Sequence, residues 1–416
     1  MLCFSLVVPA EAASVWSQTY GQGTAYSIVA TSDGGYAIAA LTARGETHSD
    51  ALLVKTDSAG NMQWSQIYGD WFIENVYSLI QTADGGYAIA GNTYSQSGLF
   101  NEDGWLVKTD AAGQLQWSKT IYGYGSDGFY SLVAAPDGGY VLAGYTTLTS
   151  TRDPWLVKTD AFGNVQWNKT YPTAPDDFAS AMIATPDGGY ALAGSGLFKT
   201  DAYGNLEWHQ THGVFNSSDS VYEVPLGDFT SLTATSDGGY AACGLVGDGG
   251  KDIFGFESTD CRLVKTDKLG NLQWNKTYGD AGVDLAFSLL QTQDGGYAIA
   301  GSLNYTSYIR IGYPQYDVFI GDAWLAKTDA LGNMEWNQTY GGEGIDEIRS
   351  LLATPDGGYV LAGGKGMTSG YTTTTLWLLK TDAFGVVPEF PAWATLPSLM
   401  IMTLLGAVVL KKRKQT

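Results

Sequence analysis

Carboxylates recur at one position of the sequence, four residues before a serine that opens an apolar run. They are Glu74, Asp127, Asp176, Asp284 and Asp346, and Asp228 lies three residues before its serine. If these segments surround one axis, the six acids approach one another and either raise each other's pKa or bind a cation. A hard cation such as Ca²⁺ takes about six to eight oxygens from carboxylates, carbonyls and water. The pattern predicts either a shared Ca²⁺ site or a set of loop caps that share no ion.

Histidine and cysteine add little further chemistry. The chain has three histidines, and two of them, His209 and His212, fall on one predicted strand, so no metal-ligand spacing arises. Neither a G-x-S-x-G segment nor a nucleophilic cysteine arrangement occurs. Cys243 and Cys261 flank a long loop, and we predict that a disulfide closes it, with two buried thiols as the alternative. These absences favour a protein that is not an enzyme.

Aromatic and acidic residues gather in the segments whose length varies along the chain. We predict that these residues contact a ligand: Trp71, Phe72, Phe100, Asp103, Tyr222, Phe254, Tyr305, Tyr308, Tyr313 and Tyr316. Aromatic platforms with scattered acids suit sugars, and loop variation on one face of a rigid scaffold is typical of a binding face. A glycan or another envelope protein is therefore the expected partner.

The elements that must position these residues come from an internal repeat. DGGY begins at Asp33, Asp84, Asp137, Asp187, Asp237, Asp294 and Asp356, and KTD at Lys55, Lys108, Lys158, Lys199, Lys265, Lys327 and Lys380. A tryptophan ends GNxxW or a near variant in six units, and the missing copy stands at the other end of the chain, at Trp16. The repeat units are thus circularly permuted by one strand. This permutation lets the first strand of the chain complete the last unit and close a ring, whereas an open solenoid would gain nothing from it.

Each unit of about 50 residues is predicted to hold four short strands. In the sixth unit they are Phe287–Thr292, Gly296–Ser302, Ala323–Thr328 and Asn333–Tyr340. The DGG and D-x-x-G-N segments supply the positive φ of tight turns, and no segment of the repeats has sustained helical periodicity. The expected fold is all-β, a seven-bladed β-propeller of four-stranded blades whose N-terminal strand closes the last blade.

The chain ends predict export and anchoring. Residues 1–12 are apolar and finish in an A-x-A pattern, which indicates a signal peptide. The propeller is expected over residues 13–387, a linker over 388–393, one transmembrane helix over 394–410 and a basic cytoplasmic tail over 411–416. The helix segment has 17 residues without a charge, which barely spans a bilayer. We expect the propeller on the outer face of the membrane, because basic tails stay inside.

Two resemblances add to this interpretation. From Ser14 to Gly385 the repeat T-x-D-G-G-Y … K-T-D-x-x-G-N-x-x-W resembles repeats of secreted and surface proteins of archaea and bacteria. It also resembles the tryptophan-docking repeat of quinoprotein-like propellers, where an Asp, a Gly and a Trp lock neighbouring blades, which implies the fold only. Residues 387–391, followed by the apolar segment and basic tail, resemble the PEF-type C-terminal sorting signal of archaeal surface proteins. This resemblance implies that a sortase-like protease exchanges the anchor for a lipid.

The KTD motif with its following Gly and Trp also resembles the Asp-box of sialidases, displaced by one residue. Such enzymes need an arginine cluster, and the arginines in or beside variable loops are Arg44, Arg152, Arg262, Arg310 and Arg349. No matching Tyr/Glu nucleophile pair can be chosen from the sequence. A secreted hydrolase or lyase acting on glycans is therefore the alternative to a binding, adhesion or envelope-structural module.

Charge excludes one class of partner. The 416 residues carry a net charge of −20 with only 15% charged residues, so no basic face for nucleic acid is expected. Sequons begin at Asn168, Asn216, Asn275, Asn304 and Asn337. They predict a surface glycoprotein, although drift between repeats gives the same pattern.

Overall fold

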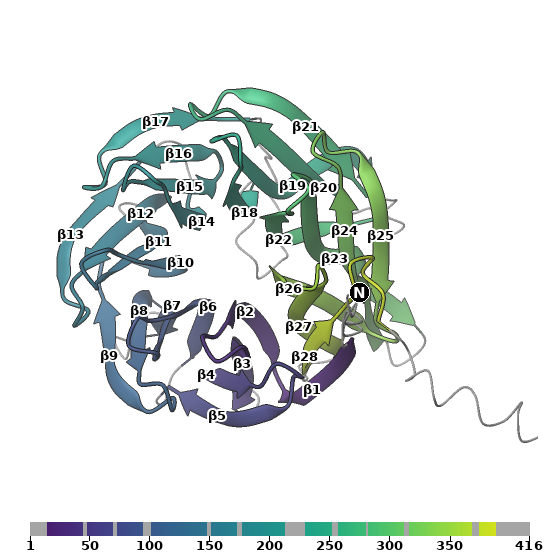
Figure 1. Ribbon diagram of the computed structural model, residues 1–416, viewed down its shortest axis with the longest axis horizontal. Helices are drawn as coiled ribbons and strands as arrows, with labels where there is room; N and C mark the ends of the chain where they lie inside the picture. The colour runs from purple at the N-terminus through teal and green to yellow at the C-terminus, as the bar shows by residue number, and fades with distance from the viewer. Residues whose placement is uncertain are drawn as a thin grey trace, which may run out of the picture.

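The computed structural model describes residues 15–44, 48–69, 73–94, 101–147, 151–172, 177–212, 229–251, 257–279, 282–311, 316–367 and 374–387. Its 28 strands fall into seven groups of four within these ranges, arranged around a common centre (Figure 1). We number these blades from the N-terminus, so that blade 1 contains β2 to β5. The part of the chain that is described holds no helix that could cross a membrane. The predicted signal peptide and transmembrane segment lie outside the described residues.

Each blade is an antiparallel meander that runs from the centre of the ring to its rim. The innermost strands are β2 (Thr24–Ala30), β6 (Glu74–Gln81), β10 (Asp127–Ala134), β14 (Ala179–Ala184), β18 (Phe229–Ala234), β22 (Leu285–Gln291) and β26 (Ile345–Ala353). The second strands are β3 (Tyr36–Arg44), β7 (Tyr87–Tyr94), β11 (Tyr140–Thr147), β15 (Tyr190–Gly194), β19 (Tyr240–Lys251), β23 (Tyr297–Ile311) and β27 (Tyr359–Met367).

The outer half of each blade follows the same order. The third strands are β4 (His48–Thr56), β8 (Glu102–Thr109), β12 (Arg152–Thr159), β16 (Leu197–Thr200), β20 (Glu257–Thr266), β24 (Tyr316–Thr328) and β28 (Thr375–Lys380). The outer strands are β5 (Met62–Tyr68), β9 (Leu115–Ile121), β13 (Val165–Thr170), β17 (Leu206–Gln210), β21 (Leu272–Tyr278), β25 (Met334–Tyr340) and β1 (Trp16–Gln22).

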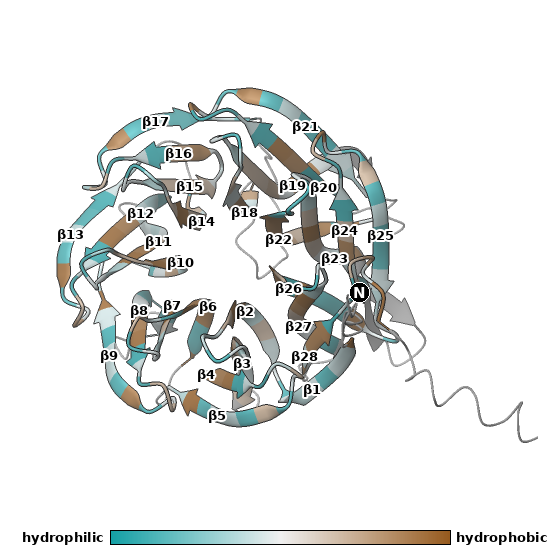
Figure 2. Cartoon of the chain, viewed as in Figure 1, coloured by the Kyte–Doolittle hydropathy of each residue, from teal (hydrophilic) through white to brown (hydrophobic). Residues whose placement is uncertain are grey.

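The hydrophobic core is divided among the blade interfaces. Seven clusters of buried side chains each join two neighbouring blades, and one of them packs Ile28 and Ile38 of blade 1 against Val360 and Leu378 of blade 7. Hydrophobic residues are concentrated in the inner strands, whereas the outer strands alternate between hydrophilic and hydrophobic (Figure 2). This alternation is the pattern of a strand with one face on the core and one in water.

The N-terminal strand closes the ring, as the permuted repeat predicts. Strand β1 pairs antiparallel with β28, from Trp16 opposite Lys380 to Gln22 opposite Thr375. At the inner strands, the Ile28 amide of blade 1 donates to Ser350 Oγ of blade 7 at 3.2 Å, as the Leu79 amide of blade 2 does to Ser27 Oγ. The seam therefore has the same contacts as an ordinary interface.

Two blades depart from the predicted strand lengths. In blade 6 the segment predicted as a loop, Ser302 through Asp322, is largely a continuation of β23 and β24, which pair as far as Ile311 opposite Tyr316. Strands β19 and β20 of blade 5 extend in the same way, to Lys251 opposite Glu257. Backbone pairing beyond the sheet satisfies groups that a long irregular loop would leave to water.

Candidate functional site

Most charged residues of the repeat serve the fold. In every blade the DGGY aspartate binds the buried KTD lysine, with Nζ–O distances of 2.7–2.9 Å. Lys108 Nζ also donates to the Thr109 carbonyl and to Gln116 Oε1. The hydrogen bond from Lys55 lowers the pKa of Asp33 to about 2. These residues hold the turns of each blade and are not candidates for a unique site.

Blade contacts at the rim follow the tryptophan-docking pattern. Trp64 of blade 1 packs on Gly113 of blade 2, and the Tyr68 hydroxyl donates to the Gly113 carbonyl at 2.6 Å. The other pairs are Trp16–Gly60, Trp117–Gly163, Trp167–Gly204, Trp208–Gly270, Trp274–Gly332 and Trp336–Gly385. A contact between a tryptophan and a glycine of the next blade is thus present at all seven interfaces of the described ring.

The described members of the predicted acid ring do not converge on one ion. Asp127 accepts hydrogen bonds from the Gly123 amide at 2.6 Å and from Thr146, and Asp346 accepts from the Gly342 amide at 2.7 Å and from the Gly366 amide of β27 at 2.8 Å. Glu74 and Asp284 are equally buried, whereas Asp176 and Asp228 lie outside the described residues. Across the described ranges no three metal-binding side chains gather. The geometry fits the loop-cap explanation, because the Asp127 and Asp346 carboxylates each accept from a backbone amide of the loop that precedes their strand.

Each of these acids instead faces a second carboxylate of the preceding blade. The pairs are Asp50–Glu74, Asp103–Asp127, Asp153–Asp177, Asp260–Asp284 and Asp322–Asp346. Burial raises the pKa of Asp127, and the Asp103 charge raises it further. Sequence reasoning missed the partner, although an aspartate five residues before the KTD lysine signals it in five units. In blade 4 the buried acid is Asp177, one residue after the predicted Asp176.

For most of the aromatic residues that we predicted to contact a ligand, the structure does not describe the side chain. Trp71, Phe72, Phe100, Tyr222, Phe254 and Tyr313 lie outside the described residues. Tyr305, Tyr308 and Tyr316 lie on the extended hairpin of blade 6, where only the backbone is described. Asp103 is 5% exposed, so it lies between blades 2 and 3 and not on an open face.

The predicted disulfide is not formed. Cys243 and Cys261 are buried free thiols on neighbouring strands of blade 5. Cys243 stands opposite Leu263, whereas Cys261 stands opposite Leu245, so the two cysteines are diagonal neighbours. The alternative of two buried thiols is therefore the one observed, and burial raises the pKa of Cys243 to about 12.

A site that the sequence did not reveal lies at the inner edge of the blades. In every innermost strand the pairing with the second strand shifts at one equivalent residue, a β-bulge. Bulges re-aim side chains and are common next to binding sites. The seven bulge residues, here called the axial ring, are Tyr26, Tyr77, Tyr130, Ser180, Thr230, Phe287 and Arg349. All seven are half-buried, and they do not follow the repeat.

Five members of the axial ring form a continuous wall across four blade interfaces. Tyr77 contacts Tyr26 and Tyr130, with ring centroids 5.6 and 5.0 Å apart. The Arg349 guanidinium lies 4.4 Å from the Tyr26 ring and 4.9 Å from the Phe287 ring, and an ion pair to Glu347 holds it there. The remaining two members are small hydroxyl residues whose side chains donate to backbone carbonyls. One side of the axis is therefore aromatic and cationic.

A second cluster connects this wall to the side of the ring where the loops vary in length. Tyr145 stacks on Tyr130 at 5.5 Å and donates to Glu102, which also accepts from Tyr94 at 2.7 Å. The exposed Arg152 guanidinium lies 4.8 Å from the Tyr145 ring. Tyr145 and Glu102 are thus a Tyr/Glu pair beside an arginine, which the sequence alone did not identify.

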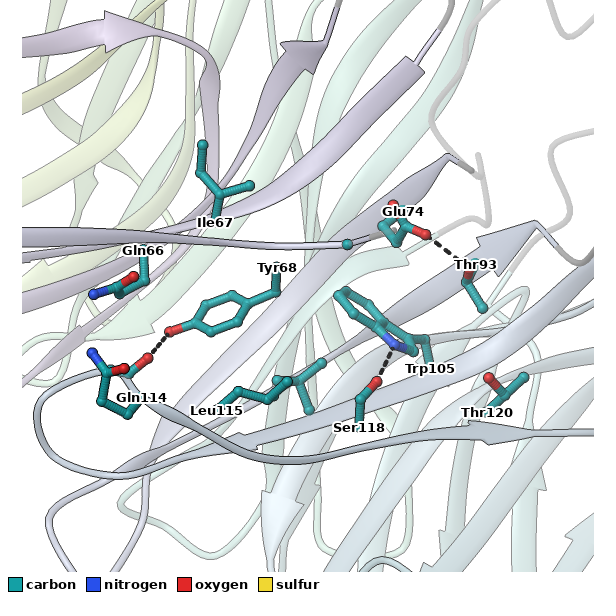
Figure 3. Close-up of a pocket in the computed structure, with 13 residues that line it drawn as sticks. Gln66, Ile67, Tyr68, Glu74, Thr93, Trp105, Gln114, Leu115, Ser118 and Thr120 are labelled. Atoms are coloured by element: carbon teal, nitrogen blue, oxygen red, sulfur yellow. Dashed lines mark hydrogen bonds between the residues drawn. The ribbon is translucent and has the colours of Figure 1, made fainter. Parts of the chain in front are cut away.

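A separate groove opens at the rim between blades 1 and 2, with a volume of about 420 Å³. Figure 3 shows Gln66, Ile67 and Tyr68 of β5 on one side, and Trp105 of β8 with Leu115 and Ser118 of β9 on the other. We call it the side groove. It shares no lining residue with the axial ring.

Comparisons with known proteins give no family. No family model matches the chain, and no curated protein matches its sequence. Among solved structures it is similar to YCF48 bound to D1 peptide, at 11% identity and TM-score 0.48 over 90% of this chain and 98% of that one. BamB from Moraxella catarrhalis is 12% identical at TM-score 0.46, over 87% of this chain and 98% of that one. Values this low carry no argument about ligand or activity.

Proposed function

We propose that this protein is a cell-surface binding module whose ligand contacts the axial ring from the variable-loop side. The observation that carries the proposal is the break in the repeat at the axis. Residues that hold the fold recur in each blade, whereas the seven bulge positions carry four aromatic residues, one arginine and two small hydroxyl residues. A unique ligand needs a unique arrangement of side chains, and these non-repeating positions supply one within the described part of the chain.

The chemistry of the axial wall favours a glycan. Aromatic faces present large apolar area that suits the C–H face of a sugar ring. Burial raises the pKa of Tyr77 and Tyr130 well above the ordinary value, so both phenols stay protonated and can donate hydrogen bonds. The Arg349 charge is largely compensated by Glu347, so the wall has no strong preference for an anion. Neutral sugars stacked against Tyr26, Tyr77 and Tyr130 fit this surface best.

A glycan hydrolase is the second candidate, and the pair of Tyr145 and Glu102 beside Arg152 is the observation in its favour. A nucleophilic tyrosine has to reach substrate and lose its proton. Tyr145 is fully buried, and burial together with the Glu102 charge raises its pKa. Both effects keep the phenol neutral and away from solvent, so binding without chemistry is the better supported proposal.

Surface anchoring is part of the same proposal. The last described segment turns at Asp382 and ends at Val387, which packs against the hydrophobic cluster between blades 6 and 7 on the side of the DGG and D-x-x-G turns. The variable loops lie at the opposite ends of the strands. An anchor that follows residue 387 therefore leaves the axial mouth facing away from the membrane. The exposed sequon residues Asn168, Asn275 and Asn337 on outer strands suit a glycosylated surface protein.

Binding of the full-length chain to a glycan array and to envelope proteins tests the proposal. We expect Tyr77→Ala and Tyr130→Ala each to weaken binding up to about tenfold, because each removes a stacking face worth about 0.5–1.5 kcal/mol. Phe162→Ala and Tyr203→Ala are matched controls, since both rings are about 70% exposed on outer turns and should leave binding unchanged. Thermal melts confirm folding, and Tyr77→Phe separates stacking from the hydroxyl. Binding that persists in both axial variants contradicts the proposal.

A further inference from the structure

The rim contact between blades 4 and 5 contains a histidine where five other interfaces of the described ring contain a tyrosine. Each tyrosine stands four residues after the docking tryptophan, and its hydroxyl donates to the carbonyl of the docked glycine at 2.6–2.7 Å. The five are Tyr20, Tyr68, Tyr171, Tyr278 and Tyr340. The equivalent residue is His212 between blades 4 and 5, and the buried Ile121 between blades 2 and 3. Among these residues only the histidine changes its charge near neutral pH.

His212 is part of the packed interface. Trp208 of β17 packs on Gly270 of blade 5, and His212 follows four residues later with its Nε2 atom buried. The centroid of the His212 ring lies 6.3 Å from that of Phe229, in β18 of blade 5. A proton on His212 is therefore held between two blades and not in open water, and burial of this kind disfavours the charged form of a histidine.

A buried guanidinium of blade 5 lies beside this histidine. Arg262, in β20, donates to the His212 carbonyl, and its guanidinium lies 5.6 Å from the centre of the Phe229 ring. Protonation of His212 thus brings a second positive charge close to an existing one, in a place from which water is largely excluded. Like charges so placed repel each other, which again favours the neutral imidazole.

The groups around His212 act mostly in one direction. Burial is the main cause that lowers the pKa of His212, the Arg262 charge lowers it further, and His209 adds a smaller effect of the same sign. The Gly270 carbonyl acts in the opposite direction. In an unfolded chain a histidine titrates at about pH 6.5. Because the folded pKa lies below the unfolded one, the stability from neutral His212 is present above that pH and is lost as the pH falls below it.

We infer that the contact between blades 4 and 5 is an acid-sensitive joint, which opens locally when His212 takes up a proton while the tyrosine contacts at other interfaces stay closed. The same interface reaches the axis, where the Ser180 hydroxyl of blade 4 donates to the Phe229 carbonyl of blade 5. Ser180 and Thr230, which follows Phe229, are both members of the axial ring. Acid therefore changes the spacing of two ring positions, whether or not a ligand binds there.

Hydrogen exchange of the full-length chain, followed by mass spectrometry at about pH 8 and about pH 5, tests the inference once the intrinsic dependence of exchange on pH is removed. At the acidic pH, peptides from β17 and β18 should lose protection, whereas peptides from β25, which carries Tyr340, should keep it. A local measurement is needed because the raised pKa values of Asp127 and Asp346 give stability that is lost as the pH rises, the opposite dependence.

His212→Tyr gives this interface the residue of five others and should abolish the loss of protection at acidic pH. His209→Gln is the matched control on the same strand and should preserve the loss. The His209 ring stacks on Phe198 at 4.4 Å, and Phe198 belongs to the cluster between blades 3 and 4. If His212→Tyr does not fold, His212→Gln replaces it, since glutamine takes up no proton at these pH values.

Three results would overturn the inference. The first is a wild-type chain whose β17 and β18 peptides keep their protection at the acidic pH. The second is an equal loss of protection in the wild type and in His212→Tyr, because another group would then be the one that titrates. The third is an equal loss in every blade, since acid would then unfold the whole ring instead of opening one interface.

Discussion

At the scale of single residues, one glycine in each blade satisfies two separate requirements. Gly113 has φ of +75°, and a Cβ on it would lie 2.6 Å from the Trp64 ring of the preceding blade. The first requirement belongs to the turn and the second to the blade interface. Gly138 has nearly the same φ, +82°, but its nearest neighbouring atom would be 3.9 Å away. The two glycines therefore separate the backbone effect from the docking effect.

We predict that Gly113→Ala destabilises the protein more than Gly138→Ala. Both lose about 1–2 kcal/mol because an alanine at positive φ is strained. Gly113→Ala loses about 1–3 kcal/mol more, because the methyl group forces Trp64 out of its place. Guanidinium unfolding of the two variants beside the wild type measures the difference. Equal losses would show that tryptophan docking adds nothing to the strength of the interface.

The role of residues that recur in each blade could be predicted from the sequence, whereas the role of residues that do not recur could not. The DGGY, KTD and tryptophan positions recur in each unit, so their structural role follows from the period alone. The axial ring has five residue types in its seven positions, among them tyrosine at Tyr77 and arginine at Arg349, and no motif marks it. A bulge is set by backbone geometry at the inner edge of the sheet, which leaves no fixed side-chain signal.

At the scale of elements, strand β1 closes the ring by pairing with β28. Trp16 docks on Gly60, Tyr20 donates to the Gly60 carbonyl at 2.6 Å, and Ser17 accepts from the Trp377 indole at 2.9 Å. The strand thus joins blade 7 to blade 1 by side chains as well as by the ladder with β28. The permuted tryptophan made this element predictable, because its partner motif stands at the far end of the chain.

Removing residues 14–20 should lower the melting temperature of the propeller. The deletion exposes the edge of β28 and loses the burial of Trp16, worth about 1.5–3 kcal/mol before ladder hydrogen bonds are counted. Differential scanning calorimetry of the deleted chain measures the loss. A chain that lacks only residues 1–13 is the control and should melt like the intact protein. An unchanged melting temperature after the longer deletion would mean that β1 does not close the ring.

Element lengths were less predictable than element order. The four-strand meander follows from the turn motifs, whereas the extension of β23 to Ile311 replaces a predicted loop. The segment from Tyr305 to Tyr316 has aromatic residues that suit a loop platform and a strand equally well. Pairing between two chain segments decides between these structures, and a single sequence does not show that pairing.

At the scale of the whole molecule, the two ends of the described chain lie on one side of the ring. Trp16 opens β1 opposite Lys380, the last residue of β28, and Val387 follows the turn at Asp382. The axial ring lies toward the other side, in the half of each inner strand that follows a variable loop. The end of the described chain and the proposed ligand site at the axial ring thus lie toward opposite sides of the ring.

The anchor itself is tested by removing it. Deleting residues 394–416 should release the propeller into the medium, because residues 394–410 are 17 uncharged residues and the only segment of that kind after the repeats. Deleting only residues 411–416 should leave the chain in the membrane fraction, since the apolar segment remains. This shorter deletion also removes the basic residues that favour a cytoplasmic position for the tail. Immunoblots of medium, membrane and cytoplasm measure both chains, and protease added to intact cells reports which face the propeller occupies. If the longer deletion leaves the protein in the cytoplasm, residues 1–12 do not direct export. If it stays with the membrane, another segment holds it there.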